Sequence, residues 1–211
     1  MIQDLPTTET EAAANLSLHL QQGNLPRFFP LCQQGFLVKV PGSGSIRTVL
    51  CRHLGLSPDY LEGRIQTIFL NGKPVDELDA AIVGHGDTLA LSAAMPGLVG
   101  ATMRRGGHFA GLRANISHRD QDLEVQRGEC LVKLKLFNLL TGELGPFFLE
   151  KGIWVNEAVL EEFLHLQPED FWAGFFAAYI NGEELDLQAL PAMAWPHREA
   201  LVHLRVIVSS G

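Results

Sequence analysis

Residues 69–76 read FLNGKPVD, and residues 179–186 read YINGEELD. The same spacing of 110 positions relates residues 54–59 (LGLSPD) to residues 164–169 (LHLQPE), and no gap is needed between the two matches. Solenoid repeats have periods of about 20–50 residues, so this period is too long for one of their units. It is the length of a small domain, and the chain therefore reads as two copies of one fold.

The composition of the chain is that of a globular protein large enough for two small cores. The 211 residues are 46% apolar and 19% charged, and each half can bury a core of its own. The net charge of −8 argues against a nucleic-acid partner. We expect no membrane span, since no run approaches 18 apolar residues, and no secretory leader. Three widely spaced cysteines without a CxxC pair indicate reduced thiols and a cytoplasmic location.

The first half predicts a mixed set of strands with one helix. Leu16, Leu18 and Leu20 alternate with polar residues, which is typical of a half-buried strand over 15–22. Asn71-Gly72 is a tight hairpin signal. Further strands are predicted over 35–40, 65–70, 73–75 and 88–93, and a helix over 46–54 between Ser45 as N-cap and Gly55 as C-cap.

The second half predicts the same order of elements. A strand over 130–136 is followed by a hairpin turn at 140–143 and a return over 147–149 and 152–155. Asn156 is the expected N-cap of a helix over 157–164. Strands are predicted over 175–180, before the Asn181-Gly182 turn, and over 200–208, where apolar residues on both faces indicate a central strand.

A β-hairpin, a helix, a strand, a short strand and a long central strand form, in that order, the β-grasp arrangement of ubiquitin-like proteins. The first half resembles the ThiS/MoaD family of small sulfur carriers, in residues 70–75 (LNGKPV), 84–91 (GHGDTLAL) and 94–97 (AMPG). The resemblance covers about residues 15–97 and, more weakly, 130–211. The expected fold class is therefore α+β, with two tandem β-grasp domains, each a mixed sheet packed on one helix. The expected division is a polar lead-in (1–14), domain 1 (15–97), a Gly/Arg-rich connector (98–128) and domain 2 (129–211).

The resemblance implies a sulfur carrier whose C-terminal Gly-Gly carboxylate is adenylated and converted to a thiocarboxylate. In the first half the chain continues beyond Gly97, so no carboxylate is available there. The second half ends Ser210-Gly211, with serine in place of the penultimate glycine. Gly211 is thus the candidate carrier terminus, and an adenylating enzyme would be its partner.

The connector has an unusual charge pattern. Residues 88–119 contain no Asp or Glu although the protein is acidic. Glycine-rich backbone can present N–H groups to an anion, and guanidinium groups add bidentate charge. The candidate anion- or partner-binding residues are Arg104, Arg105, Gly106, Gly107, His108 and Arg113. A solvated linker whose arginines pair with the acidic halves explains the same pattern.

No catalytic or cofactor-binding motif accompanies these features. The sequence contains no P-loop, no GxSxG, no HxxxH and no HExxH, so we expect no enzyme activity, no cofactor and no metal site. The favoured function is a non-enzymatic protein-interaction module that uses the connector as its contact surface. Two alternatives stay open: the sulfur carrier, and a small-ligand or anion-binding protein with a site between the two halves.

Overall fold

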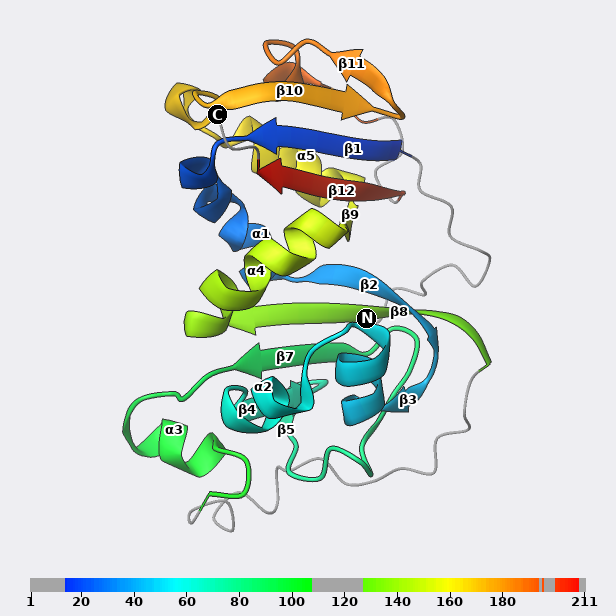
Figure 1. Ribbon diagram of the computed structural model, residues 1–211, viewed down its shortest axis with the longest axis vertical. Helices are drawn as coiled ribbons and strands as arrows, with labels where there is room; N and C mark the ends of the chain where they lie inside the picture. The colour runs from blue at the N-terminus through cyan, green and yellow to red at the C-terminus, as the bar shows by residue number, and fades with distance from the viewer. Residues whose placement is uncertain (1–13, 108–126, 194, 196–199, 209–211) are drawn as a thin grey trace. The chain divides into compact units, whose positions relative to one another are not determined.

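The computed structural model describes residues 14–107, 127–193, 195 and 200–208 (Figure 1). The chain forms two compact units, unit 1 (Met1–Phe36 with Gly142–Gly211) and unit 2 (Leu37–Thr141). Both units contain helices together with strands in parallel and antiparallel pairs, so the predicted α+β class is confirmed. Each unit is described by itself below.

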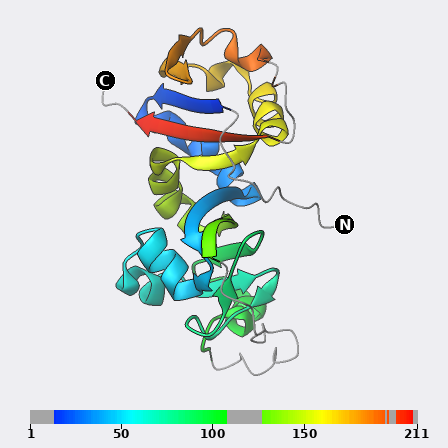
Figure 2. The same ribbon diagram turned by 90° about the vertical axis from the view of Figure 1, so that its right-hand side faces the viewer.

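Unit 1 is built on five strands with a parallel pair inside. Their order is β11 (Glu183–Leu185), β10 (Phe175–Ile180), β1 (Ala14–Leu20), β12 (Leu201–Val208) and β9 (Ile153–Asn156). β1 and β12 run parallel from Ala14↔Val202 to Leu20↔Val208, and the other pairs are antiparallel. The two strands lie side by side in both views (Figures 1 and 2). β12 thus has a neighbour on each side, which confirms its predicted central position.

The core of unit 1 lies on one face of this sheet. Leu16 and Leu18 are fully buried, as the alternation in the sequence predicts, and so is Leu204, the register partner of Leu16. The Phe28 ring lies 5.4 Å from Phe171, centroid to centroid, within a wider aromatic cluster. The helical elements of unit 1 are η1 (Gln22–Phe28), α1 (Phe29–Gln34), most of α4 (Leu139–Lys151), α5 (Glu157–His165), η4 (Glu169–Phe171) and η5 (Leu190–Ala192).

Unit 2 also contains a central parallel pair. Its strands follow the order β2 (Phe36–Gly42), β8 (Arg127–Phe137), β7 (Thr88–Ser92), β4 (Thr67–Leu70) and β5 (Lys73–Pro74). β7 and β8 run parallel, whereas β4 is antiparallel to both β7 and β5. A separate two-stranded sheet joins β3 (Gly44–Ser45) to β6 (Ile82–Val83), and the helices are η2 (Thr48–His53), α2 (Pro58–Gly63) and α3 (Gly97–Met103).

Each unit combines strands from both sequence repeats. In unit 2 the last strand of the first repeat, β7, pairs with the first strand of the second repeat, β8. In unit 1 the first strand of the chain, β1, pairs with the last one, β12. The compact units and the predicted ranges 15–97 and 129–211 therefore divide the chain in different ways.

The two Asn-Gly turns and the caps at Ser45 and Asn156 are confirmed. Asn71 and Asn181 have φ of 50° and 51°, and the glycine after each also has positive φ, as a type I′ hairpin requires. The Ser45 hydroxyl accepts the Thr48 N–H at 3.2 Å, at the start of a helix that continues in the wide π form. The Asn156 side chain accepts the Ala158 N–H at 2.9 Å and caps α5.

The predicted hairpin turn at 140–143, with its return over 147–149, is wrong. These residues belong to the helix α4, although it contains two glycines and Pro146. Leu140, Leu144 and Phe148 recur every four residues and are buried, so tertiary burial outweighs the local turn propensity. A Cβ at Gly145 would lie 3.1 Å from the Phe29 ring, so glycine here lets α1 pack closely. Only the later part of the predicted return, β9, is a strand.

Candidate partner-binding surface

The first part of the predicted connector folds into the short helix α3. Pro96 precedes the helix in an extended conformation, and Gly97 begins it with φ of 76°. Gly100 is buried against the backbone of Met95, where any Cβ would overlap the Met95 carbonyl. Glycine at position 100 therefore allows the helix to fold back on the residues before it. Leu98 and Val99 remain 70% and 65% exposed.

Arg105 attaches the end of α3 to the rest of unit 2. Its backbone N–H donates to Gln66 O at 2.8 Å. Its guanidinium lies 3.0 Å from the Glu62 carboxylate and donates to Leu61 O at 3.3 Å. The side chain is only 13% exposed. Of the predicted binding residues, Arg105 thus has a clear structural role.

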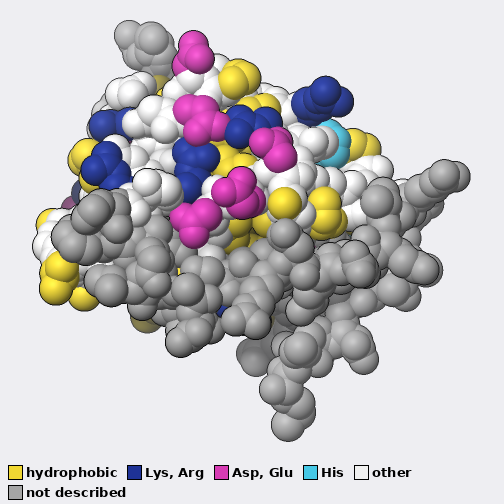
Figure 3. Space-filling model, turned by 90° about the horizontal axis from the view of Figure 1, so that it is seen from below, with side chains coloured by type: hydrophobic (Ala, Val, Ile, Leu, Met, Phe, Trp, Pro, Cys, Tyr) yellow, Lys and Arg dark blue, Asp and Glu magenta, His cyan; other side chains and the backbone are white. Residues whose placement is uncertain are grey.

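Glu62 also joins Arg105 to an ion-pair cluster. Arg47 contacts Glu62 at 2.7 Å and Asp79 at 2.9 Å. The hydrogen bond from Arg47, followed by the charge of Arg105, holds the pKa of Glu62 below its ordinary value. On the face drawn in Figure 3, acidic and basic side chains likewise lie among one another rather than in separate patches. The cluster stabilises the segment that follows α3.

The other predicted anion-binding residues lie partly within the described chain. Arg104 is exposed at the end of α3. The Gly106 N–H donates to Asp76 Oδ1 at 3.1 Å, and the Gly107 N–H donates to Arg104 O at 3.2 Å. Oxygens of the protein itself therefore accept both glycine N–H groups. His108, Arg113 and the candidate carrier terminus Gly211 lie outside the described residues, and their roles stay predictions.

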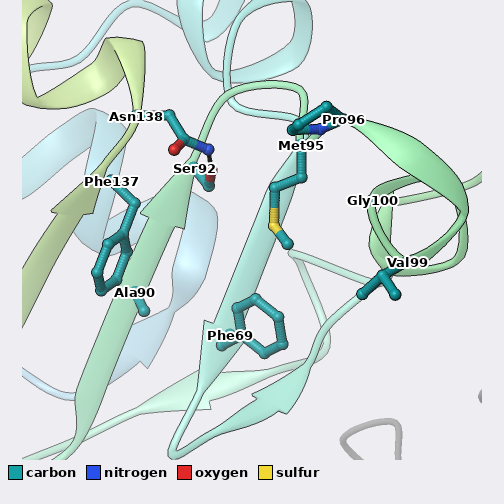
Figure 4. A pocket seen from close by; sticks show the side chains of 9 residues that line it. All are labelled: Phe69, Ala90, Ser92, Met95, Pro96, Val99, Gly100, Phe137 and Asn138. Atoms are coloured by element: carbon teal, nitrogen blue, oxygen red, sulfur yellow. Dashed lines mark hydrogen bonds between the residues drawn. The ribbon is translucent and has the colours of Figure 1, made fainter.

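A pocket of about 430 Å³ opens between α3 and the sheet of unit 2 (Figure 4). Most of its wall is apolar. Within the wall, the Asn138 amide donates to the Ser92 hydroxyl at 2.9 Å. The lining side chains come from β4, β7, β8 and the residues around α3, and they are Phe69, Ala90, Ser92, Met95, Pro96, Val99, Gly100, Phe137 and Asn138.

The sequence predictions did not include this pocket. Phe69, Ala90 and Phe137 occupy the outer positions of their strands, whereas their neighbours Ile68, Leu91 and Leu136 are buried. The sequence signal that could have revealed the pocket is that these outward positions are apolar, because the outer face of an exposed strand normally carries polar residues. Strand pairing brings these residues together, since Phe69 is opposite Ala90 and Ser92 is opposite Phe137.

Two lysines follow the pocket along β8. Lys135 is the register partner of Ala90, and Lys133 is the partner of Thr88. Burial, and then the charge of Lys135, lowers the pKa of Lys133 below its ordinary value. Among the described residues, neither ammonium has an ion pair, whereas Lys39 on β2 is paired with Glu129 at 2.9 Å. Lys133 and Lys135 are called the lysine row below.

No other chemistry stands out in the described ranges. All three cysteines are reduced thiols, and burial raises the pKa of Cys32 to about 12. Within these ranges, no three His, Cys, Asp or Glu side chains gather as a metal ion would require. No helix of the described chain is long and apolar enough to cross a membrane.

Comparison with models of protein families, with curated proteins and with solved structures found no match to this chain.

Proposed function

We propose that this chain is a non-enzymatic protein-interaction module built from two β-grasp-like units. The strand directions support the β-grasp part of the proposal. In each unit a parallel pair has an antiparallel neighbour, and a short strand lies at one edge. The resemblance to ThiS/MoaD carriers in the first repeat is consistent with this arrangement.

The contact surface lies at the start of the connector. We name it the α3 surface and define it by Met95, Pro96, Leu98, Val99 and Phe137. The observation that carries the proposal is the pair Leu98 and Val99, which are strongly exposed beside an apolar pocket. Single exposed apolar residues are ordinary on proteins, but neighbouring ones next to a hollow are typical of interaction sites.

Site-specific photo-cross-linking tests this proposal, and the chain offers a matched control. Leu98 is 70% exposed on the α3 surface, and Leu166 is 73% exposed in unit 1. A benzophenone amino acid is placed at one position or the other in the cells that produce the protein. We expect a discrete cross-linked protein from position 98 and not from position 166. Val99→Asp should reduce the adduct, since a carboxylate beside the pocket opposes apolar contact.

Two outcomes would overturn the proposal. One is the absence of any adduct from position 98. The other is the same set of adducts from positions 98 and 166, which would indicate non-specific contact with exposed leucines.

A further inference from the structure

The partner segment can be inferred from the chemistry along β8. We propose that the pocket in unit 2 binds an apolar side chain of a short acidic segment, whose carboxylates contact the lysine row. This inference rests on the proposed function, since it names the chemistry of the partner that the α3 surface would recognise. It adds a site that includes the sheet, beyond the connector.

The pocket is suited to one apolar group. Its volume of about 430 Å³ falls within the range of roughly 300–1,000 Å³ that is usual for ligand pockets. Phe69, Val99 and Phe137 supply carbon surface, while Ser92 and Asn138 already share a hydrogen bond (Figure 4). Among the described residues, no charged side chain lines the pocket, so a buried charge would lack a partner from them.

The spacing of residues on β8 defines the pattern of the segment. Phe137, Lys135 and Lys133 are two residues apart, so their side chains lie on one face at steps of about 6.6 Å. An extended partner segment has the same period. An apolar residue in the pocket would then be followed, at the second and fourth positions along the segment, by side chains opposite Lys135 and Lys133.

The charge of this row favours carboxylates. Two ammonium groups lie near each other, and the structure shows no acidic side chain paired with either of them in the described ranges. A carboxylate that approaches both ammonium groups offsets their mutual repulsion, which strengthens its attraction to the row. The net charge of −8 repels an acidic segment from the protein as a whole, so the attraction to this face comes from the local positive charge of the row.

Fluorescence anisotropy with synthetic peptides tests the inference on the full-length protein. The probes are labelled Phe-Ser-Glu-Ser-Glu and its reverse, Glu-Ser-Glu-Ser-Phe, because either strand direction fits the spacing. Matched control peptides carry Gln in place of both Glu residues, or Ser in place of Phe. We expect one of the two acidic peptides to bind, and each control peptide to bind at least about tenfold more weakly.

Variants of the protein locate the site. The double variant Lys133→Gln, Lys135→Gln should weaken binding of the acidic peptide by at least about tenfold, and remove most of its salt dependence. Lys73→Gln alters an exposed lysine on β5 and should leave binding within about twofold. Val99→Asp should abolish binding while the lysine row is intact. Thermal melts of each variant verify folding. The control peptides test the need for the carboxylates and for the apolar side chain on the unaltered protein, so their result does not depend on whether a variant folds.

Three results would overturn the inference: no binding of either acidic peptide, equal binding of the Gln peptide, or binding that the lysine variant leaves unchanged. Binding only of anionic phospholipid vesicles or of an oligonucleotide would also overturn it. The cross-linking experiment separates the two proposals. An adduct at position 98 without peptide binding would support the interaction module and overturn only the acidic segment as its partner. The absence of an adduct would overturn the interaction module itself.

Discussion

Arg105 shows how a residue predicted as a binding group can be structural. It was predicted because it belongs to a run of arginines and glycines without acidic neighbours in sequence. In the fold, its guanidinium contacts the carboxylate of Glu62 and the carbonyl of Leu61, both more than 40 positions away in the chain. A local charge pattern cannot reveal a partner at that distance.

Arg105→Ala is expected to destabilise the protein by about 1–2 kcal/mol, because a mostly buried guanidinium loses charge-assisted hydrogen bonds. Arg52→Ala, at an exposed arginine of η2, should change the free energy of unfolding by no more than about 0.5 kcal/mol. Urea unfolding of both variants measures the difference. Equal stability of the two variants would mean that Arg105 does not anchor α3.

Glu62 predicts a pH dependence with a definite sign. Its ion pairs with Arg47 and Arg105 lower the pKa of the folded carboxyl below the ordinary value of 4.5. A carboxyl whose pKa is lowered by folding stabilises the protein above its unfolded pKa, and this contribution is lost as pH falls through the folded value. Glu62→Gln should thus reduce the free energy of unfolding at pH 7. Below about pH 4, the variant and the unaltered protein should become more similar in stability. If the difference in stability between the variant and the unaltered protein stayed constant from pH 7 to pH 3, the ion pairs of Glu62 would not contribute to stability.

Cys32 should be unreactive in the folded protein. It is fully buried, and its pKa is raised to about 12, so almost none of it is thiolate at pH 8. Iodoacetamide at pH 8 is expected to leave Cys32 unmodified for hours, and to label all three cysteines after unfolding in guanidinium. Peptide mass mapping identifies the labelled positions. Rapid labelling of Cys32 without denaturant would show that α1 opens readily.

At the level of elements, helix caps were predictable and the helix α4 was not. A cap depends on a side chain and an N–H within a few positions, as at Asn156. The α4 segment carries Gly142, Gly145 and Pro146, which indicate a turn when only near neighbours are considered. Its helix depends on burial of residues four positions apart, which provides more free energy than the turn propensity removes.

Removal of the Asn156 cap should be measurable. Asn156→Ala is expected to reduce the free energy of unfolding by about 1 kcal/mol, because the Ala158 N–H loses its acceptor at the first turn of α5. Asn156→Asp keeps a side-chain oxygen at the same place and should retain most of the stability. Thermal or urea unfolding compares the two. An alanine variant as stable as the aspartate variant would show that the cap contributes nothing.

At the level of the whole molecule, the central parallel pairs join the two sequence repeats. Residues 1–107 contain β7 but lack its parallel neighbour β8, and residues 127–211 contain β12 but lack β1. Each fragment therefore leaves a central strand with one unpaired edge and exposes apolar core residues. Neither fragment is expected to fold when produced alone.

Co-expression of the two fragments should restore a folded complex that purifies as a 1:1 pair, which amide hydrogen exchange and size-exclusion chromatography can check. Two fragments that each fold alone, with dispersed amide spectra, would instead make the sequence repeats independent domains.

The amino-acid sequence alone determined the repeat, the α+β class, most strand positions, both Asn-Gly hairpins and the caps at Ser45 and Asn156. These features depend on interactions among residues a few positions apart, where residue type and spacing carry the information. Only the tertiary structure decided that β7 pairs with β8 and β1 with β12, that Phe69 and Phe137 share a pocket, and that Arg105 meets Glu62. Such contacts join residues tens of positions apart or more. They are selected by the burial and hydrogen bonding of the complete chain, which no local pattern encodes.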